Sequence, residues 1–304
     1  PEWVLHTTGV IPALSAVIKA LTQPGDKVLI QTPVYNHFFT SIHNSGCQAA
    51  ESPLVYRDNT YTIDFDDLER KAADPAVKLM LLCNPHNPAG RVWTPAELHR
   101  IGELCLRHDV VVVADEIHCE LVMPGFRYTP FASLCEEFER RSVTCTSPSK
   151  AFNLAGLQVA NIFAADAALR ARIGHSLQIN ETGEIGPFAI EALIAAYDEG
   201  AEWLDALNEY LHGNYRFSRE YFDRNLPQYP VLPLEGTYLV WVDCRASGLT
   251  SDELETKLLE EAKLRINPGA IYGEAGRDFI RLNIACPRKL LAEGLDRLRK
   301  VLKR

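Results

Sequence analysis

The chain has 304 residues, of which 47 % are hydrophobic and 23 % are charged, close to the average for globular proteins and enough to form one large and one smaller domain. Its formal net charge of -9 argues against a nucleic-acid partner, because such partners attract basic surfaces. Apolar runs such as VVVVA at 110–114 are too short to cross a bilayer, so no membrane partner is expected.

The first half of the chain alternates between helical and strand patterns. Several apolar runs show no polar alternation, which is typical of parallel strands that helices cover on both faces. Thr94-Pro95-Ala96-Glu97 has the form of a capping box and predicts the start of a helix. In chain order we predict a helix over 12–23, a strand over 27–33, helices over 37–46 and 61–73 (the latter entered through Asp64), a strand over 78–85, a helix from Thr94 to His108, and strands over 110–116 and 142–146.

This alternation predicts an α/β fold with three layers, in which a mainly parallel sheet lies between two layers of helices. The stretch between Thr146 and Gln158 is too short for a crossover helix. We therefore expect residues 158–166 to return as an antiparallel strand, which makes the sheet mixed.

Beyond residue 185 the pattern changes to long helices, predicted over 187–211 and 214–225. A smaller C-terminal α+β domain follows, built from 236–244, a helix from Ser251, the segments 265–273 and 278–286, and a last helix from Arg288. We place a large ligand-binding domain at 1–200, and the connecting helix with the small domain at 201–304.

Polar side chains follow the predicted strands where these strands end, and in open parallel sheets ligands bind at that edge. The stretch TTGVIP at 7–12 enters the first helix and, with Ser147, offers donors to an anion such as a phosphate. The residues that we expect to converge are Tyr35, Asn84, Asn87, Asp115, Glu116, His118, Ser147, Ser149 and Lys150.

The chemical groups in this set match pyridoxal phosphate (PLP). An amine at Lys150 forms a Schiff base with a carbonyl cofactor, and a carboxylate at Asp115 keeps a pyridine nitrogen protonated. The ring of Tyr35 stacks on the cofactor, and the helix N-terminus receives the phosphate.

Three other interpretations fit less well. Ser147 to Lys150 spells the S-x-x-K of penicillin-binding serine enzymes, but the companion S-D-N and K-T-G elements are missing from the sequence. A nicotinamide site lacks any G-x-G spacing. A metal at Asp115, Glu116, His118 and Cys119 requires adjacent residues at a strand end to point the same way, and they point apart.

Four stretches resemble the fold-type I PLP enzymes of the class I/II aminotransferase superfamily: NPHNPAG (84–90), VVVVADEIH (110–118), SPSKAFNLAG (147–156) and FIRLNIA (279–285). The resemblance implies that Lys150 is the Schiff-base lysine, Asp115 the partner of the pyridinium and Tyr35 the stacking ring. It also implies that Asn87 binds the phenolic oxygen and Arg281 the substrate carboxylate. Ser147, Ser149, Gly9, Val10 and Ile11 complete the expected cofactor contacts.

Within that superfamily, PVYNHF, DEIHCEL and SKAFNLAGLQ are most similar to the MalY/PatB-type cystathionine β-lyases. Typical aminotransferases carry tyrosine at the position of His118, whereas the lyase branch carries histidine. The resemblance therefore implies a carbon–sulfur β-lyase that releases pyruvate, ammonia and a thiol such as homocysteine. Two alternatives stay open: an aminotransferase that uses an amino acid and a 2-oxo acid, and a regulatory role in binding another protein.

The sequence also departs from the family pattern. Gln158 stands where many aminotransferases have a phosphate-binding arginine. Pro1 is not a natural initiator, so we expect further residues, among them the family's N-terminal segment, to precede it. The eight cysteines form no C-x-x-C pair, which indicates reduced thiols in a cytoplasmic protein. The family resemblance further implies a homodimer.

Overall fold

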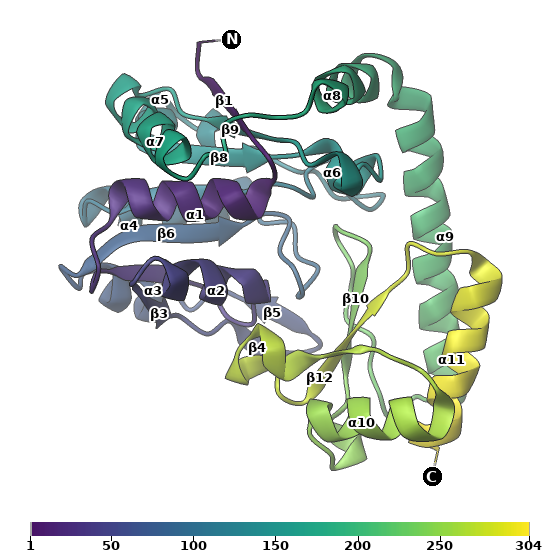
Figure 1. Cartoon of the computed structure of the whole chain (residues 1–304). Helices are drawn as coiled ribbons and strands as arrows, with labels where there is room; N and C mark the ends of the chain where they lie inside the picture. Colours follow the sequence, from purple (N-terminus) through teal and green to yellow (C-terminus); the bar gives the residue numbers. More distant parts are fainter. Residues whose placement is uncertain (1, 304) are drawn as a thin grey trace.

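The computed structural model describes residues 2–303, and in that range the largest sheet has seven strands in the order β1-β9-β8-β7-β6-β2-β3 (Figure 1). In this order, the neighbouring strands β8, β7, β6, β2 and β3 pair in parallel. Strand β9 pairs antiparallel with β8 and with β1. This confirms the mixed sheet and the antiparallel return. The strands are β1 Val4–Thr7, β2 Lys27–Ile30, β3 Gln48–Glu51, β6 Val77–Cys83, β7 Val111–Asp115, β8 Ser142–Thr146 and β9 Ala160–Phe163.

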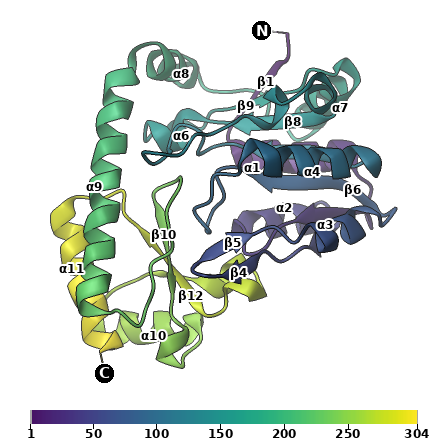
Figure 2. The same ribbon diagram turned by 180° about the vertical axis from the view of Figure 1, so that it is seen from behind.

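Helices cover both faces of this sheet, as the two opposite views show (Figures 1 and 2). Alternate residues of β6 enter separate hydrophobic cores: Leu79 and Leu81 pack into one, and Met80 and Leu82 into the other. Burial on both faces explains why this strand is apolar from Leu79 to Cys83. One face carries α1 Val10–Leu21, α2 Asn36–Asn44 and α7 Ala167–Ile179, and the other carries α3 Phe65–Ala72, α4 Pro95–Arg107 and α5 Glu136–Arg140.

The C-terminal α+β domain has a three-stranded sheet with the order β10-β12-β11 and a third hydrophobic core. The lower half of the long helix α9 runs along this domain, and its upper end leads to α8, which lies above α6 (Pro148–Ala151) (Figure 1). The elements are α8 Pro187–Glu199, α9 Ala201–Asn225, β10 Leu239–Asp243, α10 Ser251–Ala262, β11 Asn267–Pro268, β12 Phe279–Asn283 and α11 Arg288–Leu302.

The predicted helix over 187–211 is wrong in one respect, because the structure divides it at Gly200 into α8 and α9. A Cβ atom at Gly200 would lie 2.3 Å from the carbonyl oxygen of Ala196 and 2.6 Å from the ring of Phe152. Close packing therefore requires glycine at this break. The predicted boundary near 211–214 is also wrong, since α9 continues through it to Asn225.

The start of the helix predicted over 61–73 also differs. Thr60–Thr62 forms β5, which pairs with β4 (Val55–Arg57) in a hairpin. The helix begins at Phe65, where the side chain of Asp64 accepts hydrogen bonds from the backbone N–H groups of Asp66 and Asp67. The capping box of Thr94 and Glu97 is confirmed at the start of α4. No helix between residues 2 and 303 is long and apolar enough to cross a membrane.

Candidate active site

A cavity of about 300 Å³ lies between the carboxyl edge of the central sheet and the C-terminal domain. This volume is at the lower end of the roughly 300–1,000 Å³ that small-molecule and cofactor sites occupy. The parallel register places Cys83 opposite Asp115 and Asp115 opposite Cys145, so the ends of three strands meet here. Ten of the predicted residues line the cavity: Gly9, Val10, Ile11, Tyr35, Asn87, Asp115, His118, Ser149, Lys150 and Arg281.

Lys150 and Asp115 supply the opposite charges of the cavity. Lys150 belongs to the short helix α6 (Pro148–Ala151), which follows β8 after the N-cap residue Ser147. Asp115 ends β7 and is 3 % exposed. Burial raises the pKa of the Asp115 carboxyl to about 7, and this rise is opposed by the N–H of Ile117 and by the charge of Lys150.

Glu116, the neighbour of Asp115, points away from the cavity. Its carboxylate accepts hydrogen bonds from the Tyr128 hydroxyl and from the backbone N–H of Phe131, the latter at 2.9 Å. Burial raises the pKa of Glu116 to about 7 as well. Among residues 2–303, no group of three or more His, Cys, Asp and Glu side chains is arranged to hold a metal ion.

His118 is a buried, neutral imidazole in the wall of the cavity. Burial and the nearby cations Lys150 and Arg281 lower the pKa of His118 to about 3. Its ring packs edge-on against Tyr238, with 5.6 Å between the ring centroids. Its Nδ1 atom is buried without a hydrogen-bond partner in the described part of the chain, which leaves it available to a ligand.

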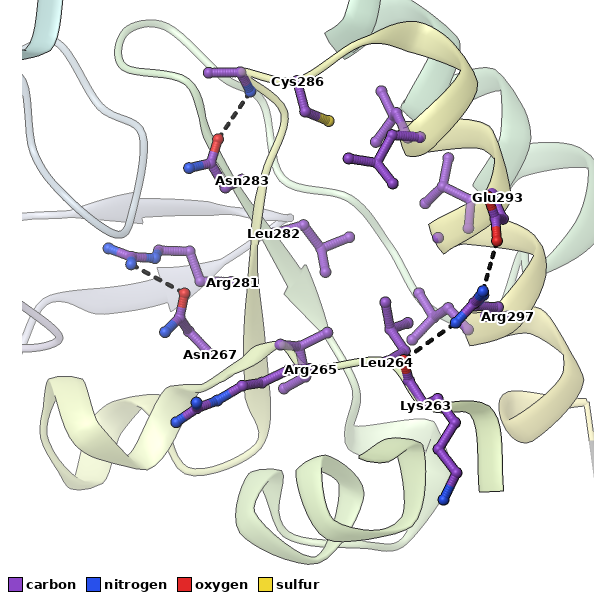
Figure 3. Close-up of a pocket in the computed structure, with 17 residues that line it drawn as sticks. Lys263, Leu264, Arg265, Asn267, Arg281, Leu282, Asn283, Cys286, Glu293 and Arg297 are labelled. Atoms are coloured by element: carbon purple, nitrogen blue, oxygen red, sulfur yellow. Dashed lines mark hydrogen bonds and ion pairs between the residues drawn. The ribbon is translucent and has the colours of Figure 1, made fainter. Parts of the chain in front are cut away.

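Arg281 brings a cation from the C-terminal domain to the same cavity. Its Nη1 donates to the Oδ1 of Asn87 at 2.9 Å, and its Nη2 donates to the Oδ1 of Asn267 at 3.1 Å. Figure 3 shows Arg281 turned toward Asn267, on the side of β12 opposite to Leu282. The Nε of Arg281 is buried without a partner among the described residues, and burial lowers the pKa of the guanidinium. Arg281 is half-buried and forms no ion pair among the described residues, and a cation in this state favours an anionic ligand.

The N-terminus of α1 faces the cavity and has no side-chain cap at Gly9. Because the first N–H groups of an α-helix have no partner within the helix, those of Val10 and Ile11 are available to an anion. Pro12, which follows them, has no N–H to contribute.

The comparisons with known proteins agree with this geometry. A family model described as aminotransferase class I and II matches residues 1–298. The chain belongs to this family. It is 43 % identical over 302 residues to the cystathionine beta-lyase PatB of Bacillus subtilis, a match that covers 99 % of this chain and 78 % of that protein. It is 35 % identical to the protein MalY of Escherichia coli, over 97 % of this chain and 75 % of the relative.

Solved structures of the family have the same fold. Cystalysin from Treponema denticola, whose crystal structure contains a pyridoxal 5'-phosphate cofactor, superposes with a TM-score of 0.97. The sequence identity is 37 %, and the match covers 99 % of this chain and 77 % of that chain. The fold is therefore that of the fold-type I family, as the sequence predicted.

The structure does not bring Ser147 to the cavity. Its hydroxyl donates to the carbonyl of Val159 at 2.6 Å and accepts from the N–H of Ser149 at 3.1 Å, so it serves as the N-cap of α6. The side chain of Ser149, two residues later, lines the cavity. Gln158 is exposed and does not line the cavity.

Two polar residues that line the cavity, Tyr238 and Asn283, were not predicted from the sequence. Asn283 follows Arg281 by two residues on β12, so the two side chains share a face of the strand. This spacing could have predicted from the sequence that Asn283 lies beside Arg281. Figure 3 shows both side chains on the same side of the strand. Tyr238 immediately precedes β10, and its position depends on how the C-terminal domain packs against the central sheet.

Proposed function

We propose that the chain is a PLP-dependent carbon–sulfur β-lyase of the cystathionine β-lyase type, which acts on a small amino-acid thioether. The observation that carries this proposal is the convergence of Lys150, Asp115 and Arg281 on one cavity. These residues supply an amine, a buried carboxylate and a cation for a carboxylate. The 43 % identity to PatB favours the lyase over the other activities of the family.

The residues fit PLP at each of its functional groups. When bound, this cofactor supplies a ring that accepts the electrons of a bond broken at the substrate Cα atom. Asp115 would hold the pyridine nitrogen, whose positive charge would compensate the cost of burying the carboxylate. The Tyr35 ring would bind the cofactor ring, while the N–H groups of Val10 and Ile11 and the Ser149 hydroxyl would hold the phosphate.

Asn87 and His118 are assigned to the phenolic oxygen of the cofactor. The hydrogen bond from Arg281 occupies the Oδ1 of Asn87, so the amide NH₂ group is free to donate. The imidazole of His118 is neutral near pH 7, because its pKa is lowered to about 3 in the free chain. A neutral imidazole carries one N–H donor, which distinguishes it chemically from the tyrosine hydroxyl of typical aminotransferases.

Lys150 and Arg281 act on the substrate. The guanidinium of Arg281 binds the α-carboxylate, because its planar fork matches two carboxylate oxygens. The amine of Lys150, in the same cavity, would hold the carbonyl carbon of the cofactor and would take the proton from the substrate Cα. The bond between Cβ and sulfur breaks, and the sulfur leaves with its electron pair. With L-cystathionine and one water molecule, the products are homocysteine, pyruvate and ammonia.

A product balance tests the proposal. PLP-loaded protein is incubated with L-cystathionine without any added 2-oxo acid, and pyruvate, ammonia and homocysteine are measured. The lyase releases the three products in equal amounts. An aminotransferase instead requires 2-oxoglutarate or pyruvate as amino acceptor and releases no ammonia, which would refute the proposal.

We also propose a cytoplasmic homodimer, as the sequence predicts. Apolar side chains are exposed on α8 and at the start of α9, including Phe188 at 79 %, Ile194 at 46 % and Trp203 at 48 %. A surface of this kind is typical of a protein interface. All eight cysteines are free thiols, which supports a reducing compartment. Sedimentation of the purified protein and fractionation of cells test these two assignments.

The division of the chain into residues 1–200 and 201–304 is likewise a proposal. Gly200 separates α8 from α9, and α9 packs against α11 in the C-terminal domain. Limited proteolysis is expected to cut near Gly200 before it degrades either part, and preferential cleavage inside α9 would contradict this boundary.

A further inference from the structure

A second cavity, of about 510 Å³, adjoins the first one between α6, α9 and the loop that follows β12. The two cavities share the side chains of Ser149, Lys150 and Tyr238. In Figure 1 the first half of α9 stands opposite α6, and the loop between β12 and α11 crosses α9 below the level of α6. Because Lys150 borders both spaces, a substrate held beside its amine has access to the second cavity.

The wall that α9 contributes to this side cavity is apolar and aromatic, whereas Ser149, Lys150 and Asn153 line the side of α6. Trp203, Leu207 and Leu211 lie on α9, where the ring of Trp203 stacks on Phe152 with 5.9 Å between the centroids. The hydroxyl of Tyr210 accepts a hydrogen bond from the backbone N–H of Arg288 at 2.8 Å.

Charges are scarce in the same walls. Among the described residues that line the side cavity, Lys150 carries the one charged side chain. A charged group placed against Leu207 and Leu211 meets no counter-charge other than Lys150, whereas an alkyl group gains from contact with these side chains.

Tyr238 forms the partition between the two cavities. Its ring contacts His118 on the side of the first cavity and also lines the second. Arg281 lines the first cavity and not the second. The α-carboxylate and the side chain of a substrate are therefore received by different parts of the protein.

We infer that the side cavity receives the sulfur substituent of the substrate, and that the chain prefers cysteine thioethers with apolar substituents over those with charged ones. This inference rests on the proposed lyase function. It implies that L-cystathionine, whose distal end carries an ammonium and a carboxylate, is a poorer substrate than an S-alkyl-L-cysteine of similar length.

Turnover of a matched substrate series tests the preference. Pyruvate release is measured with S-methyl-, S-ethyl-, S-propyl- and S-butyl-L-cysteine, whose leaving thiols are all simple alkanethiols. We expect kcat/KM to rise with each added methylene, up to about fourfold per fully buried group. S-(2-carboxyethyl)-L-cysteine, which resembles the butyl compound in length, should be at least tenfold poorer than S-butyl-L-cysteine. A flat series, or a carboxyethyl compound that equals the butyl compound, overturns the inference.

A polar substitution in the wall provides the matched variant. Leu207→Asn should lower the preference for the butyl over the carboxyethyl compound at least fivefold. Leu204→Asn is the control, because Leu204 is also half-buried on α9 but does not line the cavity. An equal effect of both substitutions would show that the preference does not arise in this cavity.

Binding separates this inference from the proposed function. PLP-loaded Lys150→Ala protein is titrated by calorimetry with S-butyl- and S-(2-carboxyethyl)-L-cysteine. Tighter binding of the butyl compound supports the side cavity even if the native protein releases no pyruvate, a result that would refute the lyase alone. Equal binding refutes the side cavity even if pyruvate is released.

Discussion

Replacing Arg91 with methionine is expected to destabilise the protein strongly, because Arg91 lies at a buried junction directly after the NPHNPAG segment (84–90). Its Nε donates to Glu235 at 3.0 Å and its Nη2 donates to both oxygens of Glu97 at 3.1 and 3.2 Å. Its Nη1 donates to the carbonyl of Tyr61 in β5. The side chains of Arg91 and Glu235 are only 12 % and 13 % exposed.

Removal of one partner from a buried ion pair costs about 3–5 kcal/mol, because the other charge stays buried. Both carboxylates keep other donors: Glu235 accepts from the N–H of Val92 at 2.8 Å, and Glu97 accepts from the N–H of Thr94 at 2.8 Å. We therefore expect a loss near the lower end, about 3 kcal/mol in the free energy of unfolding.

Urea unfolding followed by tryptophan fluorescence measures this loss. The control is Arg70→Met, which breaks an ion pair of 2.8 Å with Asp67 in which the arginine is 68 % exposed. An exposed pair of this kind contributes at most about 1 kcal/mol. A double-mutant cycle of Arg91→Met with Glu235→Gln should give a coupling energy of at least about 1 kcal/mol. If Arg91→Met costs no more than Arg70→Met, the junction does not stabilise the fold.

Three further predictions concern the active site. Lys150→Ala should abolish the adduct with PLP that borohydride reduces, and a persistent adduct on another lysine would refute the assignment. Arg281→Lys should lower kcat/KM for an amino-acid substrate at least tenfold, since a charge-assisted hydrogen bond contributes about 1.5–3 kcal/mol, and a change of less than about twofold would place the carboxylate elsewhere. The third concerns pH: burial raises the pKa of Asp115 from 3.8 to about 7, so between these values the unfolded chain releases a proton that the folded chain retains. Asp115 should therefore make the free energy of unfolding of the PLP-free protein fall as pH rises from about 4 to 7, and the difference between the native protein and Asp115→Asn isolates this contribution. His118, whose pKa is lowered from 6.5 to about 3, contributes the opposite slope in both proteins. An unchanged slope in the variant, measured by urea unfolding at each pH, would show that Asp115 is not the titrating group.

The sequence alone was sufficient for the features that depend on neighbouring residues. The capping box of Thr94 and the uninterrupted apolar run at 79–83 act over a few positions, so their patterns predict α4 and β6 directly. Parallel topology then aligns the carboxyl ends of the strands, which made Asp115 and Lys150 candidates for one site. The family motifs extended this prediction to Arg281.

The tertiary structure decided the features that depend on packing between distant segments. Arg281 meets Asn87 across 194 positions of sequence, and the side cavity forms only where α9 passes the loop after β12. Ser147 was expected at the phosphate, but the return of β9 places the carbonyl of Val159 against its hydroxyl. The local sequence does not indicate that position 200 needs glycine. The need arises because the ring of Phe152 packs where a side chain would lie. In each case the partner lies beyond the range over which periodicity and capping patterns act, because close packing in the folded chain selects it.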